Sequence, residues 1–170
     1  MSFQLETARL WLRPWEAPDF DAFKPIATDT EVMRFINKGE PWPDENTRFF
    51  IQRQLDLFDQ RGYCRWKLIE KETGRLIGFA GPGTLLWMPR EVEIGWWIAR
   101  DKWHQGFASE GAAAAFHHAM HVIRLPRLIS VANEQNTHSI RIMHKLGMQF
   151  ERWADHESGR HVVYYAEQAP

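Results

Sequence analysis

The sequence has few of the features that mark disulfide-rich, membrane-spanning or strongly cationic proteins. Its 170 residues include one cysteine, Cys64, which excludes an internal disulfide and a cysteine-based zinc cluster and suits a reducing compartment such as the cytoplasm. No run approaches the roughly 18 apolar residues of a membrane span, and we expect no secretion signal at the start of the chain. With 21 basic and 22 acidic side chains the formal charge is −1, so we expect neither a nucleic-acid nor a membrane partner.

The chain also has no low-complexity tract, internal repeat or break in composition that would mark a linker. We therefore expect one domain over residues 1–170. A chain of this length, 44% hydrophobic, can bury a core without the help of metal or disulfides. Its nine tryptophans predict an aromatic core or an aromatic-lined cleft.

Local patterns predict an α/β (α+β) fold with a mixed, mostly antiparallel sheet and helices on both faces. Period-two alternation and turn residues predict about seven strands, over residues 8–15, 63–70, 75–79, 92–99, 127–132, 148–153 and 161–167. Helical spacing and caps predict a short helix capped by Asp19, a second capped by Asp29 or Thr30, and helices over residues 44–60, 106–123 and 137–146. A hairpin followed by alternating strands and helices is typical of such a layered sheet.

The segment after the predicted hairpin is harder to interpret. We expect Pro82 and Gly83 to interrupt the strand pattern before the apolar tip at residues 85–88. That tip could line a pocket, contact a second subunit in a homodimer, or form a buried core loop.

A strand, a short loop and a helix that starts at Gly106 form the most informative stretch. Such a turn presents free backbone N–H groups and the positive end of the helix dipole, which together favour an anion such as phosphate. Gly106 lacks the Cβ that would hold a pyrophosphate away, although an ordinary helix start with alanines for close packing gives the same pattern. No Walker motif and no dinucleotide fingerprint of three spaced glycines is present, which disfavours nucleotide hydrolysis and hydride transfer.

Four blocks together resemble the GNAT N-acetyltransferases. They are residues 5–15 (LETARLWLRPW), 92–98 (VEIGWWI), 103–112 (WHQGFASEGA), and 136–141 (NTHSIR) with 145–148 (KLGM). They span nearly the whole chain in family order, and within the superfamily they are most similar to the branch that includes the ribosomal-protein N-terminal acetyltransferases. Two departures from that branch are His104, where a glycine is usual, and Met148, where a phenylalanine is usual.

The resemblance implies that acetyl-coenzyme A (acetyl-CoA) is the co-substrate and that no metal is needed. The coenzyme would lie between the strand that ends at Ile98 and the following strand near residues 130–132, pairing like an added strand with unpaired backbone groups. The residues implied in binding it are Trp96, Trp97 and Ile98 for the pantetheine arm, His104, Gln105, Gly106, Phe107, Ala108 and Ser109 for the pyrophosphate, and Asn136 on the far side.

The implied reaction transfers an acetyl group to a primary amine, of a small molecule or of a peptide or protein N-terminus. The amine must lose a proton, for which Glu93 is the candidate base, although Glu93 could equally be a structural carboxylate bonded to a neighbouring strand. A backbone N–H of residues 95–98 could stabilise the oxyanion. Ser139 could donate to the leaving sulfur or satisfy a helix end. Met143 stands where many relatives have a tyrosine, so Tyr164 and Tyr165 remain remote alternatives.

Three weaker candidates are weighed against ordinary structural roles. Cys64 is favoured as a buried thiol over an acyl-carrying nucleophile, and His117 and His121 as a solvated helix face over a zinc site. Arg9, Arg13 and Arg53 could attract an acidic substrate but are more typical of surface charges.

Two other functions compete with the enzyme. A non-catalytic acyl-CoA binding or sensing module would keep the coenzyme cleft without turnover. A structural protein would use its tryptophan-rich surface only for association.

Overall fold

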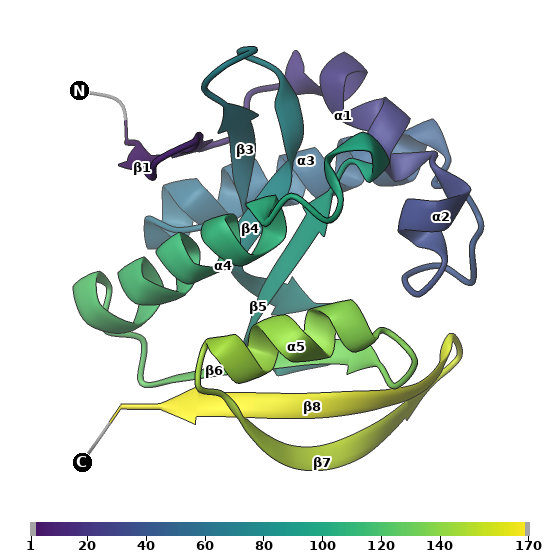
Figure 1. Ribbon diagram of the computed structural model, residues 1–170, viewed down its shortest axis with the longest axis vertical. Helices are drawn as coiled ribbons and strands as arrows, with labels where there is room; N and C mark the ends of the chain where they lie inside the picture. The colour runs from purple at the N-terminus through teal and green to yellow at the C-terminus, as the bar shows by residue number, and fades with distance from the viewer. Residues whose placement is uncertain (1–2, 169–170) are drawn as a thin grey trace.

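One twisted sheet organises the chain, with strand order β1-β2-β3-β4-β5-β6-β8-β7 (Figure 1). The structure is a computed structural model that describes residues 3–168. The strands are β1 (Leu5–Glu6), β2 (Leu10–Arg13), β3 (Trp66–Glu70), β4 (Leu76–Leu85), β5 (Met88–Ile98), β6 (Arg127–Asn133), β7 (Gln149–His156) and β8 (Gly159–Glu167). All neighbours are antiparallel except β5 and β6. The mixed, mostly antiparallel sheet is confirmed, and the strand that the sequence did not predict is the two-residue β1.

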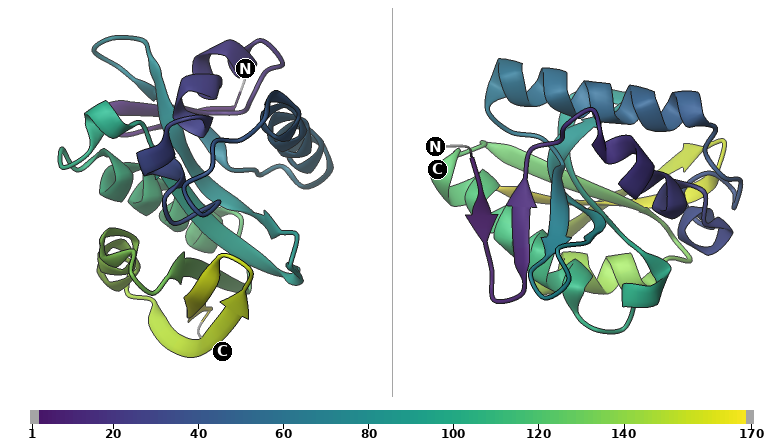
Figure 2. Two further views of the ribbon diagram at one scale, coloured as in Figure 1. Left: turned by 90° about the vertical axis from the view of Figure 1, so that its right-hand side faces the viewer. Right: turned by 90° about the horizontal axis from the view of Figure 1, so that it is seen from above.

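Helices cover both faces of this sheet, as the sequence predicts (Figure 2). The helices α1 (Asp19–Ala27), α2 (Thr30–Met33) and α3 (Asp44–Arg61) lie on one side, and α4 (Phe107–His117) and α5 (Thr137–Lys145) on the other. A 3-10 turn, η1 (Arg100–Lys102), precedes α4, and a π-helical turn, η2 (His118–Val122), continues it. No helix in residues 3–168 is both long and apolar enough to span a membrane.

The cap of α2 resolves one alternative that the sequence left open. The side chain of Asp29 accepts hydrogen bonds from the N–H groups of Glu31 (2.8 Å) and Val32 (3.3 Å). Such a carboxylate satisfies N–H groups that have no helical acceptor. Asp29 rather than Thr30 therefore caps α2, which begins at Thr30. The expectation that Asp19 caps α1 is wrong, because Asp19 is the first residue of that helix and Pro18 precedes it without a side-chain cap bond.

Two different kinds of packing hold the helices to the sheet. Under α1 and α3, Phe79 lies 5.1 Å from Phe50 and 5.0 Å from Trp97 between ring centroids, within an aromatic core. On the opposite face α4 is slim, and a Cβ at Gly111 would lie 3.0 Å from Leu68 Cδ1. Small residues let α4 lie close to the strands and bring its N-terminus to the end of β5.

The expectation that Pro82 and Gly83 interrupt the strand is wrong, because β4 continues through both to Leu85. Pro82 is paired with Ile94 of β5, whereas β3 pairs with β4 no further than Ala80. The registered pairing with β3 stops at Ala80, so the missing N–H of Pro82 costs no bond in that ladder.

The hairpin tip after Leu85 does not form a buried core loop. Leu86 is 70% exposed, and the Trp87 ring packs 4.6 Å from that of His156 at the β7–β8 turn. A contact of this tip with a second subunit stays a prediction.

Gly81 tests how tightly β3 and β4 are packed. Its φ is +154°, and a Cβ there would lie 2.3 Å from the Cys64 carbonyl oxygen and 2.9 Å from Arg65 Cα. We expect Gly81→Ala to lower the free energy of unfolding by about 2–4 kcal/mol, because backbone must move. Gly74→Ala is the control: its φ is +69° with nothing within 4 Å, and it should cost about 1 kcal/mol. Equal losses in urea unfolding would show that the close approach is not restrictive.

Candidate active site

The parallel strands β5 and β6 pair over a very short stretch and then separate. Glu93 opposite Ile129 is the one registered pair between them in the described chain. The Ser130 hydroxyl donates to the Ile94 carbonyl at 3.0 Å, next to the point of divergence. Figure 1 shows β5 running diagonally away from β6 and β8. The edge of β5 beyond Ile94 is therefore available to pair with something other than β6.

A cleft of about 490 Å³ lies at this divergence. It is bordered by α2 and the turn after it, the end of β5, the loop from η1 to α4, and the first turns of α5. Ten residues singled out from the sequence line it: Trp96, Trp97, Ile98, His104, Gly106, Phe107, Ala108, Ser109, Asn136 and Ser139. Gln105 and Glu93 do not line it. Three of the four blocks, those over residues 92–98, 103–112 and 136–148, thus converge on one cleft, while residues 5–15 do not line it.

The charge of the cleft is predominantly positive. Its lining includes four basic residues and one acidic residue, namely Arg34, Lys102, Arg141 and Lys145 against Glu31. No single block predicts this, because α2, η1 and α5 each contribute to it. An excess of cations beside a helix N-terminus favours an anionic ligand.

Gly106 is at the position where the loop turns into α4. Its φ of +83° is in the left-handed region, and a Cβ there would lie 3.4 Å from Arg9 Nη2. Backbone conformation therefore favours glycine here. The first helical bond runs from the Glu110 N–H to the Gly106 carbonyl at 3.0 Å, so the preceding N–H groups have no acceptor within the helix. Phe107, Ala108 and Ser109 line the cleft at this end.

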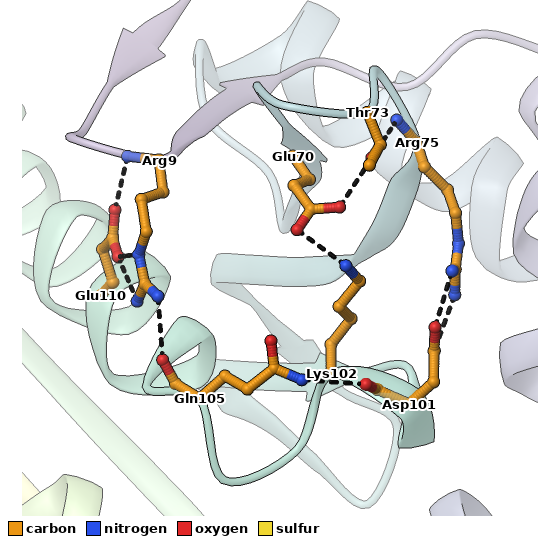
Figure 3. A network of polar contacts seen from close by, with 8 residues as sticks. All are labelled: Arg9, Glu70, Thr73, Arg75, Asp101, Lys102, Gln105 and Glu110. Atoms are coloured by element: carbon orange, nitrogen blue, oxygen red, sulfur yellow. Dashed lines mark hydrogen bonds and ion pairs between the residues drawn. The ribbon is translucent and has the colours of Figure 1, made fainter.

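Arg9 holds this loop from outside the cleft (Figure 3). Its guanidinium lies 2.7 Å from the Glu110 carboxylate and donates to the Gln105 carbonyl at 2.9 Å. It also lies 4.1 Å from the centre of the Phe107 ring. The Thr7 hydroxyl donates to the same Glu110 carboxylate at 2.6 Å. Arg9 thus connects the β1–β2 turn to Gln105 before Gly106 and to Glu110 after it. The sequence did not indicate this role.

Burial alone would raise the pKa of the Glu110 carboxyl. The hydrogen bonds from Thr7 and Arg9 outweigh this effect and lower that pKa below its ordinary value. Glu110 is therefore an anionic anchor for the loop near neutral pH.

The other end of the loop is held by the β3–β4 turn (Figure 3). Arg75 donates two hydrogen bonds to Asp101, at 2.6 and 2.7 Å, and Lys102 donates to Glu70 at 2.7 Å. The bond from Lys102 is the main cause of the lowered pKa of Glu70, and that from Arg75 of the lowered pKa of Asp101. Gln105 donates to the Asp101 carbonyl at 3.0 Å, so its side chain braces the loop.

Glu93 lies on the α1–α3 face of β5 in a buried ion pair with Arg65. Two glycines make room for this pair. A Cβ at Gly83 would lie 3.0 Å from Arg65 Cζ, and one at Gly95 would lie 3.0 Å from Glu93 Oε2. This geometry matches the structural interpretation of Glu93, while its role as base stays a prediction. The sequence could not reveal Arg65 as the partner, because 28 positions separate the two residues.

Asn136 and Ser139 lie together at the start of α5. The Asn136 side chain caps the helix by accepting from the Ser139 N–H at 3.2 Å. Both residues line the cleft. The Ser139 hydroxyl makes no hydrogen bond within residues 3–168, so it is not used to satisfy the helix end.

The remaining sequence candidates lie outside the cleft. Cys64 is fully buried, and burial raises the pKa of its thiol, which keeps it protonated and poorly nucleophilic. The Tyr164 hydroxyl lies 3.1 Å from His144 Nε2, and the Tyr165 hydroxyl donates to Gln149 at 3.3 Å. Met143 is buried.

The structure also bears on the histidines considered for a zinc site and on the arginines considered for an acidic substrate. No group of three or more potential metal ligands occurs in the described part of the chain, His117 and His121 included. Arg13 donates to Gln4 at 2.7 Å, and Arg53 donates to Thr84 at 2.6 Å.

Comparison with known proteins agrees with this geometry. The profile of the acetyltransferase (GNAT) domain matches residues 9–149, and the chain belongs to this family. It is 32% identical over 148 residues to an uncharacterized N-acetyltransferase p20 of Bacillus licheniformis, covering 86% of this chain and 83% of that protein. A crystal structure of an acetyltransferase from Agrobacterium tumefaciens superimposes with a TM-score of 0.85 at 26% identity, covering 99% and 96% of the two chains.

Proteins named for ribosomal substrates are also among the relatives. A ribosomal-protein-serine acetyltransferase of Escherichia coli is 28% identical over 122 residues, which cover 69% of this chain and 67% of that one. A ribosomal L7/L12 alpha-N-protein acetyltransferase in complex with coenzyme A has the same fold, with a TM-score of 0.80 at 16% identity over 97% and 98% of the chains. The chain is thus an acyltransferase of the N-acetyltransferase type.

The Arg9–Glu110 pair predicts a stability difference that depends on pH. Because the folded pKa of Glu110 is lowered from 4.5, its contribution is present above that value and is lost as pH falls through the folded pKa. We expect Arg9→Ala to cost about 1–2 kcal/mol at pH 7, a figure reduced for partial exposure. In urea unfolding, the difference from wild type should shrink toward pH 3.

Glu110→Gln should also lower the free energy of unfolding at pH 7, because it removes the charge with which Arg9 pairs. Its difference from wild type should likewise shrink as pH falls. Arg61→Ala is the control, because the Arg61 guanidinium contacts the neutral Tyr63 hydroxyl. A pH-independent cost for Arg9→Ala would show that the pair does not anchor the loop.

Proposed function

We propose that the chain transfers the acetyl group of acetyl-CoA to a primary amine and that the cleft between β5 and β6 binds the coenzyme. The observation that carries this proposal is the free edge of β5 beside the N-terminus of α4 in one cationic cleft. Amide groups of a pantetheine arm can pair with such an edge, and a diphosphate suits free N–H groups at a helix start. The group that the family implies therefore fits the residues present.

Each lining segment has a place in this proposal. The backbone of Trp96, Trp97 and Ile98 holds the pantetheine arm, and Asn136 approaches it from α5. The N–H groups of the loop from His104 to Ser109 hold the diphosphate, and Gly106 lets the ligand approach. Gln105 contributes through its backbone, since its side chain braces Asp101.

The thioester supplies an activated acetyl group. The neutral amine nitrogen attacks its carbonyl carbon to form a tetrahedral oxyanion, and the carbon–sulfur bond then breaks as the carbonyl re-forms. A backbone N–H of residues 95–98 stabilises the oxyanion. Ser139, whose hydroxyl faces no helix acceptor, donates a proton or hydrogen bond to the departing sulfur. Glu93 receives the amine proton directly or through water. For either route its ion pair with Arg65 must open toward the acceptor.

The acceptor is the amine of a small molecule or of a peptide N-terminus. Similarity to a ribosomal-protein-serine acetyltransferase supports testing peptides first. The single free cysteine supports a reducing compartment such as the cytoplasm. The competing proposal, an acyl-CoA binding module without turnover, is supported by the pairing of Glu93 with Arg65.

Coenzyme binding separates these proposals from a purely structural role. At 100 times its dissociation constant, acetyl-CoA should stabilise the fold by about 2.7 kcal/mol, which a melting curve resolves. We expect Gly106→Val to weaken binding at least tenfold, because a branched side chain at φ +83° blocks the loop. Gly147→Val is the control, at φ +75° in open space away from the cleft. Equal weakening by both variants would refute the loop assignment.

Thiol release from acetyl-CoA over a panel of amines and peptides tests turnover. Release that depends on an added amine supports the enzyme, whereas binding without release by any acceptor supports the module.

Glu93→Gln separates a base from a structural carboxylate. If Glu93 is the base, kcat falls by about 10²–10⁴-fold and coenzyme affinity changes little. If it only neutralises Arg65, turnover per folded molecule is unchanged and the loss is about 3 kcal/mol of stability. Equal turnover of wild type and variant at all pH values would remove Glu93 as base.

A further inference from the structure

His104 occupies a backbone conformation that suits glycine better than histidine. Its φ is +59°, in the left-handed region, and it directly precedes the last turn before α4. Among the non-glycine residues that the structure describes, Lys38 and Arg124 are the others with a positive φ. Histidine tolerates this region better than most side chains, but at some conformational cost. A strained side chain in the wall of a ligand cleft points to a use for that side chain.

A second imidazole faces His104 from another element. The ring centroids of His104 and His138 lie 5.3 Å apart at an interplanar angle of 67°. His138 is in the first turn of α5, and both residues line the cleft. Two imidazoles therefore meet where the loop before α4 approaches α5. Within residues 3–168 neither ring makes a hydrogen bond or an ion pair, so both keep their polar atoms for a ligand.

The charged groups around this pair are mostly cationic. They are Glu31 and Arg34 from the α2 region, Lys102 from η1, Arg141 and Lys145 from α5, and the Arg9–Glu110 pair behind the loop. Lys102 is bonded to Glu70 and Arg9 to Glu110, whereas no carboxylate among residues 3–168 bonds to either imidazole. The surroundings lack an acidic partner that would explain the two histidines as a structural ion pair.

We propose that His104 and His138 form a proton-dependent clamp on the diphosphate of the coenzyme, in addition to the loop N–H groups. This rests on the proposed function, since it places the coenzyme in the same cleft. An imidazole ordinarily changes charge between about pH 5 and 8. When protonated, each ring donates N–H bonds and carries a positive charge, and both favour a phosphate oxygen. Coenzyme affinity therefore rises as pH falls toward 6.

Dephospho-coenzyme A is the probe, because it keeps the diphosphate and lacks the phosphomonoester. A phosphomonoester itself changes charge near pH 6 and would obscure the titration of the protein. Isothermal titration of wild type at pH 6 and pH 8 should give roughly tenfold tighter binding at pH 6, the effect of a charge-assisted hydrogen bond.

The two variants His104→Gly and His138→Gln remove the imidazoles separately. His104→Gly keeps the backbone N–H and relieves the positive φ, so its melting temperature should rise while its pH-dependent gain in affinity falls. His138→Gln keeps a polar side chain at the start of α5 and should also reduce the gain, and the double variant should abolish it. His121→Ala, an exposed residue outside the cleft, should retain the full gain.

The outcomes separate this inference from the proposed function. Binding at pH 8 that the variants leave unchanged supports coenzyme binding in the cleft. A gain in affinity at pH 6 that is lost only when His104 and His138 are replaced supports the clamp. A gain that persists in the double variant overturns the clamp and leaves the proposed function standing. A gain seen with coenzyme A but not with dephospho-coenzyme A also overturns it, since the 3′-phosphate would then be responsible. Failure of wild type to bind acetyl-CoA at both pH values overturns the proposed function itself.

Discussion

The account depends on the interrupted pairing of β5 and β6. Parallel strands normally continue their ladder, yet here the registered contact is Glu93 with Ile129, and Ser130 bonds back to Ile94 at the divergence. Beyond this point β5 keeps β4 on one edge, with Gly78 still opposite Ile98. A strand that is fixed on one edge and free on the other is rigid enough to serve as a template for an extended ligand.

The loop before α4 completes this template because other parts of the chain hold it in place. Arg9 reaches from the β1–β2 turn, while the β3–β4 turn supplies Glu70 and Arg75. Elements that are distant in sequence thus fix the approach to a helix N-terminus. A loop anchored at both ends loses little conformational entropy when a ligand binds, which favours affinity. The N-terminal block of the sequence therefore matters for the cleft although it does not line it.

Much of the fold could be predicted because its signals are local. Alternating strands, helical spacing and the glycine before α4 each leave a mark within a few residues, and the family resemblance placed them in order. The failures concern relations between distant residues. Pro82 fits within β4 because the registered pairing with β3 stops at Ala80, and Glu93 pairs with Arg65 across the sheet. The ring of His138 meets that of His104 because α5 packs beside the loop, which no short pattern encodes.

Amide hydrogen exchange with and without acetyl-CoA tests the central claim most directly. If the free edge of β5 and the anchored loop hold the coenzyme, exchange should slow within residues 95–98 and 104–109, while residues 88–92 at the far end of β5 stay unchanged. Protection confined to another surface, such as the α3–β4 side around Arg53 and Thr84, would contradict the account.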